Sequence, residues 1–304
     1  MANPEHPHVS QRDTLIGAIF ALLAAIGFSG KAILVKLAYT HNTDAVTLLA
    51  LRMAFSVPVF IGVAFWAARR HAQPLSRHDK GLILILGLIG YYLSSLLDFL
   101  GLQYISAGLE RLILFLYPTI TVVLSALIYK RAIGHRVLAA MALCYAGIAL
   151  VFVHDMDTMQ GRILLGASLV FASTVSYSIY LVGAGHAITR IGATRFTAYA
   201  MIVACTAVLL QFSLTHPLSA LQLPPQVYTL AFAMAIFSTV LPVFMLSYAI
   251  RRIGSGNASL IGSVGPISTI YMAYLFLEEG ISLLQIAGSS LVVIGVLLIS
   301  LRRQ

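Results

Sequence analysis

The sequence predicts an all-α membrane protein of ten transmembrane helices, built as two inverted five-helix repeats with both termini in the cytoplasm. Composition is the first observation behind this prediction, because 60% of the residues are hydrophobic, 10% are charged and the mean hydropathy is +0.93. These values lie far from those of soluble domains, and apolar stretches long enough to cross a bilayer recur throughout the chain. The other two observations are an internal repeat and a one-sided distribution of basic residues.

The predicted helices follow one another with short connections, so no separate soluble domain is expected. They are placed at residues 14–38, 45–68, 80–103, 107–129, 133–153, 162–184, 194–214, 226–250, 255–277 and 281–301. The first 13 residues are polar but lack the basic region and cleavage site of a signal peptide. We therefore interpret residues 1–13 as a cytoplasmic tail.

A gapless internal repeat relates the end of each half of the chain. Residues Ile105–Val151 align with Ile253–Ile299 at a constant offset, 253 − 105 = 148, and Pro118 and Gly147 recur as the same residue type in the second copy. A weaker match relates Leu15 and Gly17 to Leu164 and Gly166. Self-similarity of this kind indicates a duplicated structural unit.

The two repeats are predicted at residues 14–153 and 162–301, with five helices in each. A unit that crosses the bilayer an odd number of times inserts its second copy in the opposite orientation. This is the inverted-repeat arrangement of many secondary transporters. Pro118 and Pro266 occupy matching positions and are expected to bend the fourth and ninth helices, which suits a rocking motion but also follows from duplication alone.

Basic residues in the connections define the predicted orientation. Fourteen Lys and Arg residues lie on one side, and only Arg162 lies on the other. The fourteen are Arg12, Arg69, Arg70, Arg77, Lys80, Lys130, Arg131, Arg136, Arg190, Arg195, Arg251, Arg252, Arg302 and Arg303. Since such residues concentrate on the cytoplasmic side, we assign both termini to the cytoplasm and the protein to the inner (plasma) membrane. The net charge of +9 mostly reflects this asymmetry, so no nucleic-acid partner is expected.

No metal or cofactor site is predicted. Cys144 and Cys205 lie inside predicted helices and are interpreted as packing residues, and the histidines show no metal-ligand spacing with Cys, Asp or Glu. The chain also lacks a phosphate-binding loop of the G-x-x-x-x-G-K-[ST] type, so ATP hydrolysis by this chain is not expected.

Six charged residues fall within or just inside the predicted helices, and all are placed in the extracytoplasmic part of the first half. They are Lys31, Lys36, Arg52, Asp98, Glu110 and Arg111. At about 1.5 Å per helical residue, Lys31, Arg52 and Asp98 lie roughly 12 to 14 Å deep, and Glu110 and Arg111 roughly 6 to 8 Å deep. The matching positions in the second half, which include Tyr180 and Met201, are uncharged.

Ionised groups at membrane depth usually face a cavity or one another. One interpretation is that Asp98 and Glu110 form structural ion pairs with Lys31 or another basic neighbour. Another is that the excess of cations binds a substrate that carries a carboxylate or phosphate. In a third, Asp98 or Glu110 exchanges a proton during transport. The sequence leaves all three open.

Aromatic and polar side chains could complete a site in the middle of the bundle. Tyr92, Tyr117, Tyr177 and Tyr180 are candidates for a cavity wall, and Asn257 is a candidate on the ninth helix. For each of these residues, core packing or lipid contact is the competing interpretation.

The two repeats resemble a known family. The run GLQYISAGLERLILFLYPTITVVLSALIYKRAIGHRVLAAMALCYAGIALV and its partner YAIRRIGSGNASLIGSVGPISTIYMAYLFLEEGISLLQIAGSSLVVIGVLLI look like the two EamA repeats of the drug/metabolite transporter superfamily. The resemblance implies a ten-helix bundle with a central cavity, an alternating-access cycle, and substrates that across the family include amino acids, other metabolites, nucleotide sugars and toxic compounds, often exported. The family repeat usually carries an acidic residue at the end of its fourth helix. Here the second copy has Glu278 and Glu279, whereas the first has Lys130 and Arg131.

We therefore expect a secondary transporter, and not an enzyme, that exports a small polar metabolite such as an amino acid or organic anion. Lys31, Arg52 and Arg111 are expected to bind an anionic group, while Asp98 and Glu110 set the charge state or carry a proton. The expected partners are the small-molecule substrate, the lipid bilayer and the proton as coupling ion. Whether the protein is a monomer or a homodimer is left open.

Two other functions remain open at this stage. An intramembrane lipid-modifying enzyme would need a nucleophile, base or metal cluster near one membrane face, and the chain offers only carboxylates without such a constellation. A non-transporting receptor or scaffold would give no reason for matched bends and buried charges.

Overall fold

Every regular element in the described part of the protein is a helix. The computed structural model describes residues 11–70, 74–130, 132–158 and 162–300. Its helices are α1 (Gln11–Tyr39), α2 (Ala45–Arg70), α3 (Arg77–Gly87), η1 (Leu88–Leu93), α4 (Ser94–Gly101), α5 (Ala107–Leu114), α6 (Tyr117–Ile128), α7 (His135–Thr158), α8 (Ile163–Ile191), α9 (Ala193–Thr215), η2 (Leu218–Leu221), α10 (Pro225–Ala235), η3 (Ile236–Val240), α11 (Leu241–Gly262), α12 (Gly265–Leu277) and α13 (Leu283–Ser300).

Seven helical stretches among the described residues are long and apolar enough to cross a membrane. They are Thr14–Tyr39, Ala45–Arg69, Arg77–Gly101, Ala107–Ile128, Ile163–Gly185, Ala193–Thr215 and Pro225–Ile250. Three shorter apolar helices are Val137–Val153, Gly265–Leu277 and Leu283–Leu298. Each predicted helix thus overlaps one of these apolar stretches, although the ninth, predicted at 255–277, begins within α11 and is interrupted before α12. The number of helices that cross the membrane stays a prediction.

Matching interruptions occur in the two halves. The π-helical turns η1 and η3 begin at Leu88 and Ile236, and 236 − 88 = 148, the offset of the repeat. A helical break at residues 115–116 is likewise matched at 263–264. Each break precedes a proline in the first turn of the next helix, where the missing N–H costs no hydrogen bond. The expected bends at Pro118 and Pro266 are therefore breaks between two helices.

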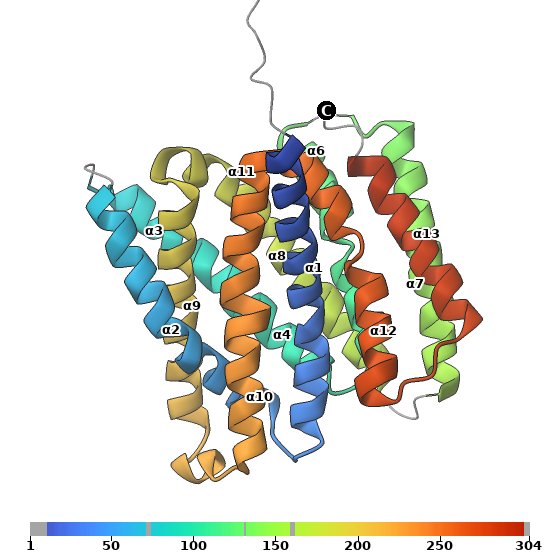
Figure 1. Cartoon of the computed structure of the whole chain (residues 1–304), viewed down its shortest axis with the longest axis horizontal. Coiled ribbons are helices and arrows are strands. Elements are labelled where there is room, and N and C mark those ends of the chain that lie inside the picture. The colour runs from blue at the N-terminus through green and yellow to red at the C-terminus, as the bar shows by residue number, and fades with distance from the viewer. Residues whose placement is uncertain (1–10, 71–73, 131, 159–161, 301–304) are drawn as a thin grey trace, which may run out of the picture.

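Contacts between α7 and α13, which lie side by side in Figure 1, relate the halves by a local two-fold axis. Cys144 Sγ donates to the carbonyl of Val292, its own repeat partner, at 3.6 Å. A Cβ on Gly147 would meet the Gly288 carbonyl, and one on Gly295 would meet the Ala140 carbonyl. Adding 148 to Ala140 and Gly147 gives 288 and 295, so each contact is the counterpart of the other.

Reciprocal contacts extend to the first helix of each half. Gly17 of α1 lies against Ile253, and its counterpart Gly166 of α8 lies against Ile105. Since 253 − 105 = 148, the two pairs are equivalent. The local two-fold therefore relates more than one pair of helices.

Helix α11 bends sharply along its length. Ala249 and Ala258 pack in one cluster with Ala21 of α1, although nine residues of straight helix would separate them by about 13.5 Å. The chain thus turns back between them, as the loop between α4 and α5 does in the first half. Ser106 caps α5 by accepting from Leu109 N, whereas the matching residue is Gly254, which has no side chain to cap a new helix.

Both ends of the described chain lie at one end of the bundle. In Figure 1, α1 begins and α13 ends at the top of the view. We refer to this as the terminal end and to the opposite one as the distal end. The largest buried apolar cluster includes Val35, Leu48 and Phe99 and packs on the distal side of Lys31.

Candidate functional site: a central cavity with a charged floor

A cavity of about 690 Å³ lies in the middle of the bundle between the two halves. Its walls come from α1, α2, η1, α4, α5, α6, α8, α9, η3 and α11. Both π-helical turns contribute, through Gly90 and Tyr91 of η1 and Ser238 and Thr239 of η3. A π-turn widens the helix locally and often marks a functional site, so the matched turns point to this cavity.

Charged residues form the distal floor of the cavity. Lys31, Arg52, Asp98 and Arg111 line it. On α1 the lining runs from Lys31 back to Ala21, which is ten residues, or about 15 Å, nearer to the terminal end. The cavity therefore extends from the charged layer toward the terminal end.

Lys31 is held between two carboxylates. Its ammonium forms an ion pair with Asp98 and a second one with Glu110 Oε1 at 2.8 Å. Glu110 is 0% exposed and lies behind Lys31. Asp98 Oδ1 and Glu110 Oε2 are buried without a hydrogen-bond partner. With both carboxylates ionised, this triad has one negative charge in excess.

Arg52 is positioned by the second π-turn. Its Nε donates to Thr239 Oγ1 at 3.0 Å, and its guanidinium carbon lies 5.4 Å from the ring centroid of Phe99. These contacts occupy one donor and one face of the guanidinium. Its remaining donors are available to a ligand in the cavity that Arg52 lines.

Arg111 is the second guanidinium at the floor. Its Nε is buried without a hydrogen-bond partner, and Nη2 lies so close to Gly265 that a Cβ there would come within 2.8 Å of it. Within the described part of the chain, neither Arg52 nor Arg111 forms an ion pair with a carboxylate. The floor thus presents two guanidiniums without a direct ion pair among the described residues, and the nearby triad, with its one excess negative charge, balances only one of the two positive charges.

Tyrosines form one wall. Tyr117 packs edge-on to Tyr177 with ring centroids 5.9 Å apart, and Tyr177 stacks on Tyr180 at 5.6 Å. The hydroxyls of Tyr91 and Tyr180 are 2.9 Å apart and hydrogen-bonded. Tyr91, Tyr117 and Tyr177 line the cavity, whereas Tyr180 supports them from behind.

A model of the EamA-like transporter family matches residues 15–153 and 164–301. The chain belongs to this family. Among the relatives of this EamA protein are two from Bacillus subtilis, each named only as an uncharacterized transporter. YcbK is 29% identical over 283 residues, covering 91% of this chain and 90% of its own. YyaM is 27% identical over 218 residues, covering 70% of this chain and 71% of its own.

A solved structure titled "Crystal structure of protein" has a similar fold. It aligns with a TM-score of 0.62 and 19% sequence identity, covering 96% of this chain and 98% of that chain. Together with the apolar helices, the family match identifies this EamA protein as a multi-pass membrane protein and a member of a transporter family. The resemblance seen in the sequence is thereby confirmed.

Most of the predicted site residues of this EamA protein meet in one place. Lys31, Arg52, Asp98, Arg111, Tyr117 and Tyr177 line the cavity, and Glu110 and Tyr180 contact that group from behind. Tyr92 packs instead against the large apolar cluster. The side chain of Asn257 lies outside the described residues. The roles predicted for these residues stay predictions.

Sequence reasoning missed the small polar residues of the wall. Ser94 Oγ and Ser173 Oγ are hydrogen-bonded at 3.0 Å, and Ser238 and Thr239 enter the cavity from η3. The repeat held one signal that could have pointed to Ser238. This residue matches Gly90 at the offset of 148, and Gly90 lies against Tyr180, one of the predicted site residues. Small residues at both positions allow a close approach of the neighbouring helix.

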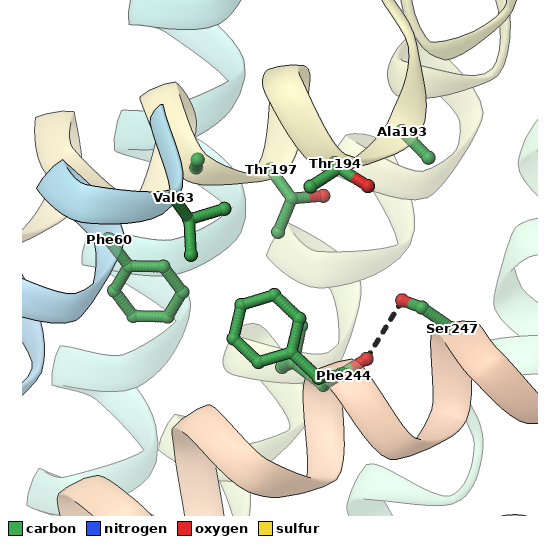
Figure 2. A pocket seen from close by; sticks show the side chains of 9 residues that line it. Phe60, Val63, Ala193, Thr194, Thr197, Phe244 and Ser247 are labelled. Atoms are coloured by element: carbon green, nitrogen blue, oxygen red, sulfur yellow. Dashed lines mark hydrogen bonds between the residues drawn. The ribbon is translucent and has the colours of Figure 1, made fainter. Parts of the chain in front are cut away.

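A niche of about 30 Å³ adjoins the cavity between α2, α9 and α11. Figure 2 shows the rings of Phe60 and Phe244 beside it, with Thr197 on the α9 side. Ser247 Oγ donates to the Val243 carbonyl at 2.8 Å, so its hydroxyl is already hydrogen-bonded. A space of this size holds a water molecule and no metabolite. No cluster of His, Cys, Asp or Glu suited to a metal occurs among the residues that the structure describes.

Proposed function

We propose that this protein is a secondary transporter that binds a small carboxylate-bearing metabolite, such as an amino acid or organic anion, in the central cavity and exports it by alternating access. The observation that carries the proposal is the cavity floor, where the guanidiniums of Arg52 and Arg111, which form no direct ion pair among the described residues, lie beside the Lys31 triad and leave one net positive charge.

The two arginines supply the anion-binding chemistry. A guanidinium offers parallel N–H donors that match a carboxylate in a bidentate arrangement, and such charge-assisted bonds are among the stronger hydrogen bonds in proteins. A buried charge without a counterion is costly at membrane depth, so binding an anion would relieve that cost at Arg52 and Arg111. The tyrosine wall would contact the apolar part of the substrate.

Asp98 would extend recognition to an amino group. Its Oδ1 is buried without a hydrogen-bond partner, and the residue lines the same floor as the arginines. A zwitterionic amino acid could place its carboxylate at Arg52 or Arg111 and its ammonium at Asp98. An organic anion would use the arginines alone. Both substrate classes are therefore part of the proposal.

The Lys31 triad would carry the proton. One ammonium between two carboxylates leaves one negative charge in excess, and protonation of Asp98 or Glu110 would neutralise it. A change in this charge would alter the field at the neighbouring arginines and thus the affinity for an anion. The ammonium of Lys31 is already paired with both carboxylates. Lys31 would therefore influence their protonation and would not bind the substrate directly.

The membrane arrangement belongs to the same proposal. All ten apolar segments would cross the inner membrane as inverted repeats, supported by the reciprocal contacts across the local two-fold. The excess of Lys and Arg in connections on one side would place both termini in the cytoplasm. The cavity would then extend toward the cytoplasm, from which an exporter takes its substrate.

The experiment is flux of amino acids and organic anions into proteoliposomes, with and without an imposed pH gradient. We expect saturable flux of a carboxylate-bearing compound that increases with the gradient. Asp98→Asn and Glu110→Gln should lose the response to the gradient, while Asp44→Asn, which is altered at the distal surface, should retain it. Retention of the response in both Asp98→Asn and Glu110→Gln would refute the assigned coupling site.

A further inference from the structure

The two mouths of the path through the bundle can be compared residue by residue, because the local two-fold interchanges them. Ile250 lines the cavity near the terminal end and is 40% exposed, whereas its counterpart Leu102, at 250 − 148, is 0% exposed near the distal end. Thr121 lines the cavity, whereas its counterpart Thr269 is fully buried. The terminal mouth is therefore open and the distal mouth is closed.

A polar cluster lies where the distal mouth is closed. Glu279, between α12 and α13, accepts a hydrogen bond from Ala107 N at 3.3 Å, and Asp155 of α7 accepts one from Ser106 N at 3.4 Å. Both donors are backbone groups at the start of α5, where a helix favours negative charge. Lys36 near the end of α1 interacts electrostatically with Glu279 and Asp155.

Glu279 is a partly buried carboxylate held by a hydrogen bond from the backbone. Burial raises the pKa of Glu279, while the hydrogen bond from Ala107 and the charge of Lys36 oppose that rise. One turn beyond this contact, α5 carries Glu110 and Arg111 at the cavity floor. Through its hydrogen bond to Ala107 N, Glu279 thus contacts the helix that carries two of the proposed site residues.

The backbone turn that presents Glu279 occurs in both halves, but the charge does not. Glu278 has φ 55° at the end of α12, and its counterpart Lys130 has φ 51° at the end of α6. The residue after this left-handed turn is Glu279 in the second half, and the sequence has Arg131 at the matching position of the first half. The counterpart of Lys36 is Gly185, at 36 + 149. The sequence therefore repeats neither the carboxylate of Glu279 nor the ammonium of Lys36 at the matching positions of the first and second halves.

We infer that Glu279, together with Asp155 and Lys36, is a latch that holds the start of α5 against α1 and α12, keeps the distal mouth closed and so favours the state open at the terminal end. The inference rests on the proposed function, since a latch of this kind matters to a carrier that opens alternately to two sides. In an export cycle the latch would have to release before the substrate could leave at the distal end.

The distal latch can be tested without a substrate, by measuring how fast a cysteine at each mouth reacts with a maleimide. Cys144 and Cys205 are both buried and would be replaced by alanine. Leu102→Cys then reports on the distal mouth through a membrane-impermeant maleimide added outside intact cells. Ile250→Cys reports on the terminal mouth in inverted membrane vesicles.

We expect Glu279→Gln to raise the labelling rate of the Leu102→Cys reporter at least several-fold and to lower that of the Ile250→Cys reporter. The matched control is Glu278→Gln, which removes an exposed neighbouring carboxylate and should change neither rate. Lys36→Gln should shift both labelling rates in the same directions as Glu279→Gln. It replaces Glu279→Gln in the test if the Glu279 variant does not fold.

Two outcomes would overturn the latch. The first is an unchanged labelling rate for the Leu102→Cys reporter in both latch variants. The second is faster labelling at both mouths together, which would indicate general loosening of the bundle. Because labelling needs no substrate, opposite shifts at the two mouths with no flux of any compound would refute the transport proposal and leave the latch standing.

Discussion

Removal of the Lys31 charge is predicted to be costly for stability, because its ammonium is the counterion of two buried carboxylates. In Lys31→Met, the apolar stem is largely kept and the charge is lost. Asp98 and Glu110 would then face each other without a cation. Breaking a buried ion pair by removing one partner typically costs about 3 to 5 kcal/mol, and we expect a loss of this size.

The loss should be recovered by neutralising the carboxylates as well. In the triple variant Lys31→Met, Asp98→Asn and Glu110→Gln, no charge is left unpaired at the former triad. Replacement of a whole buried ion pair by well-packed hydrophobic residues of similar volume is often close to neutral for stability, and Asn and Gln likewise remove the charges at almost unchanged volume. The triple variant should thus regain most of the free energy of unfolding, yet its flux should not respond to a pH gradient.

The assay is a denaturant titration of the purified protein in detergent micelles at neutral pH, which gives the free energy of unfolding for each variant. Lys80→Met is the matched control, since Lys80 is exposed near the start of α3. Lowering the pH should reduce the difference in free energy of unfolding between wild type and Lys31→Met, because protonation of the carboxylates removes the unpaired negative charges. Wild-type stability in Lys31→Met, or a triple variant no more stable than the single one, would refute the reasoning.

Two further predictions concern packing and capping. Gly147→Ala should destabilise the protein by about 1 to 3 kcal/mol, since the new methyl group would meet the Gly288 backbone at the crossing of α7 and α13. The control is Gly62→Ala, because the space around Gly62 is open. Equal free energies of unfolding for the two variants would contradict the packing argument. Ser106→Ala should cost about 1 kcal/mol by removing the cap that accepts from Leu109 N, measured by the same titration. A change below the error of the titration would show that the cap contributes nothing.

The repeat made much of the architecture predictable. An offset of 148 measured on residues such as Pro118 and Pro266 also relates the helix breaks, the π-turns and the contacts at Cys144. It could not reveal the π-turns themselves, because an extra residue in a helical turn leaves no periodic mark that distinguishes it from regular helix. The connection predicted between residues 250 and 255 is instead a tight bend within one helix, α11.

The charged layer was predictable as a set of residues but not as a set of pairs. Lys31, Arg52, Asp98 and Arg111 stand out because charges are rare in apolar helices, and they do line one cavity. Which carboxylate pairs with which cation depends on how the helices rotate and cross. Hydropathy contains no information about that, so Lys31 and the arginines could not be separated by role.

The most direct test of the central claim is counterflow exchange of carboxylate-bearing compounds in proteoliposomes, comparing wild type with Arg111→Gln and with Arg69→Gln. Arg69 lies over the ring of Phe65 at an exposed helix end and is the control for loss of one positive charge. Our account predicts exchange by wild type and Arg69→Gln, and at least a tenfold loss, about 1.4 kcal/mol, in Arg111→Gln. Exchange at the wild-type rate in a folded Arg111→Gln variant would contradict it.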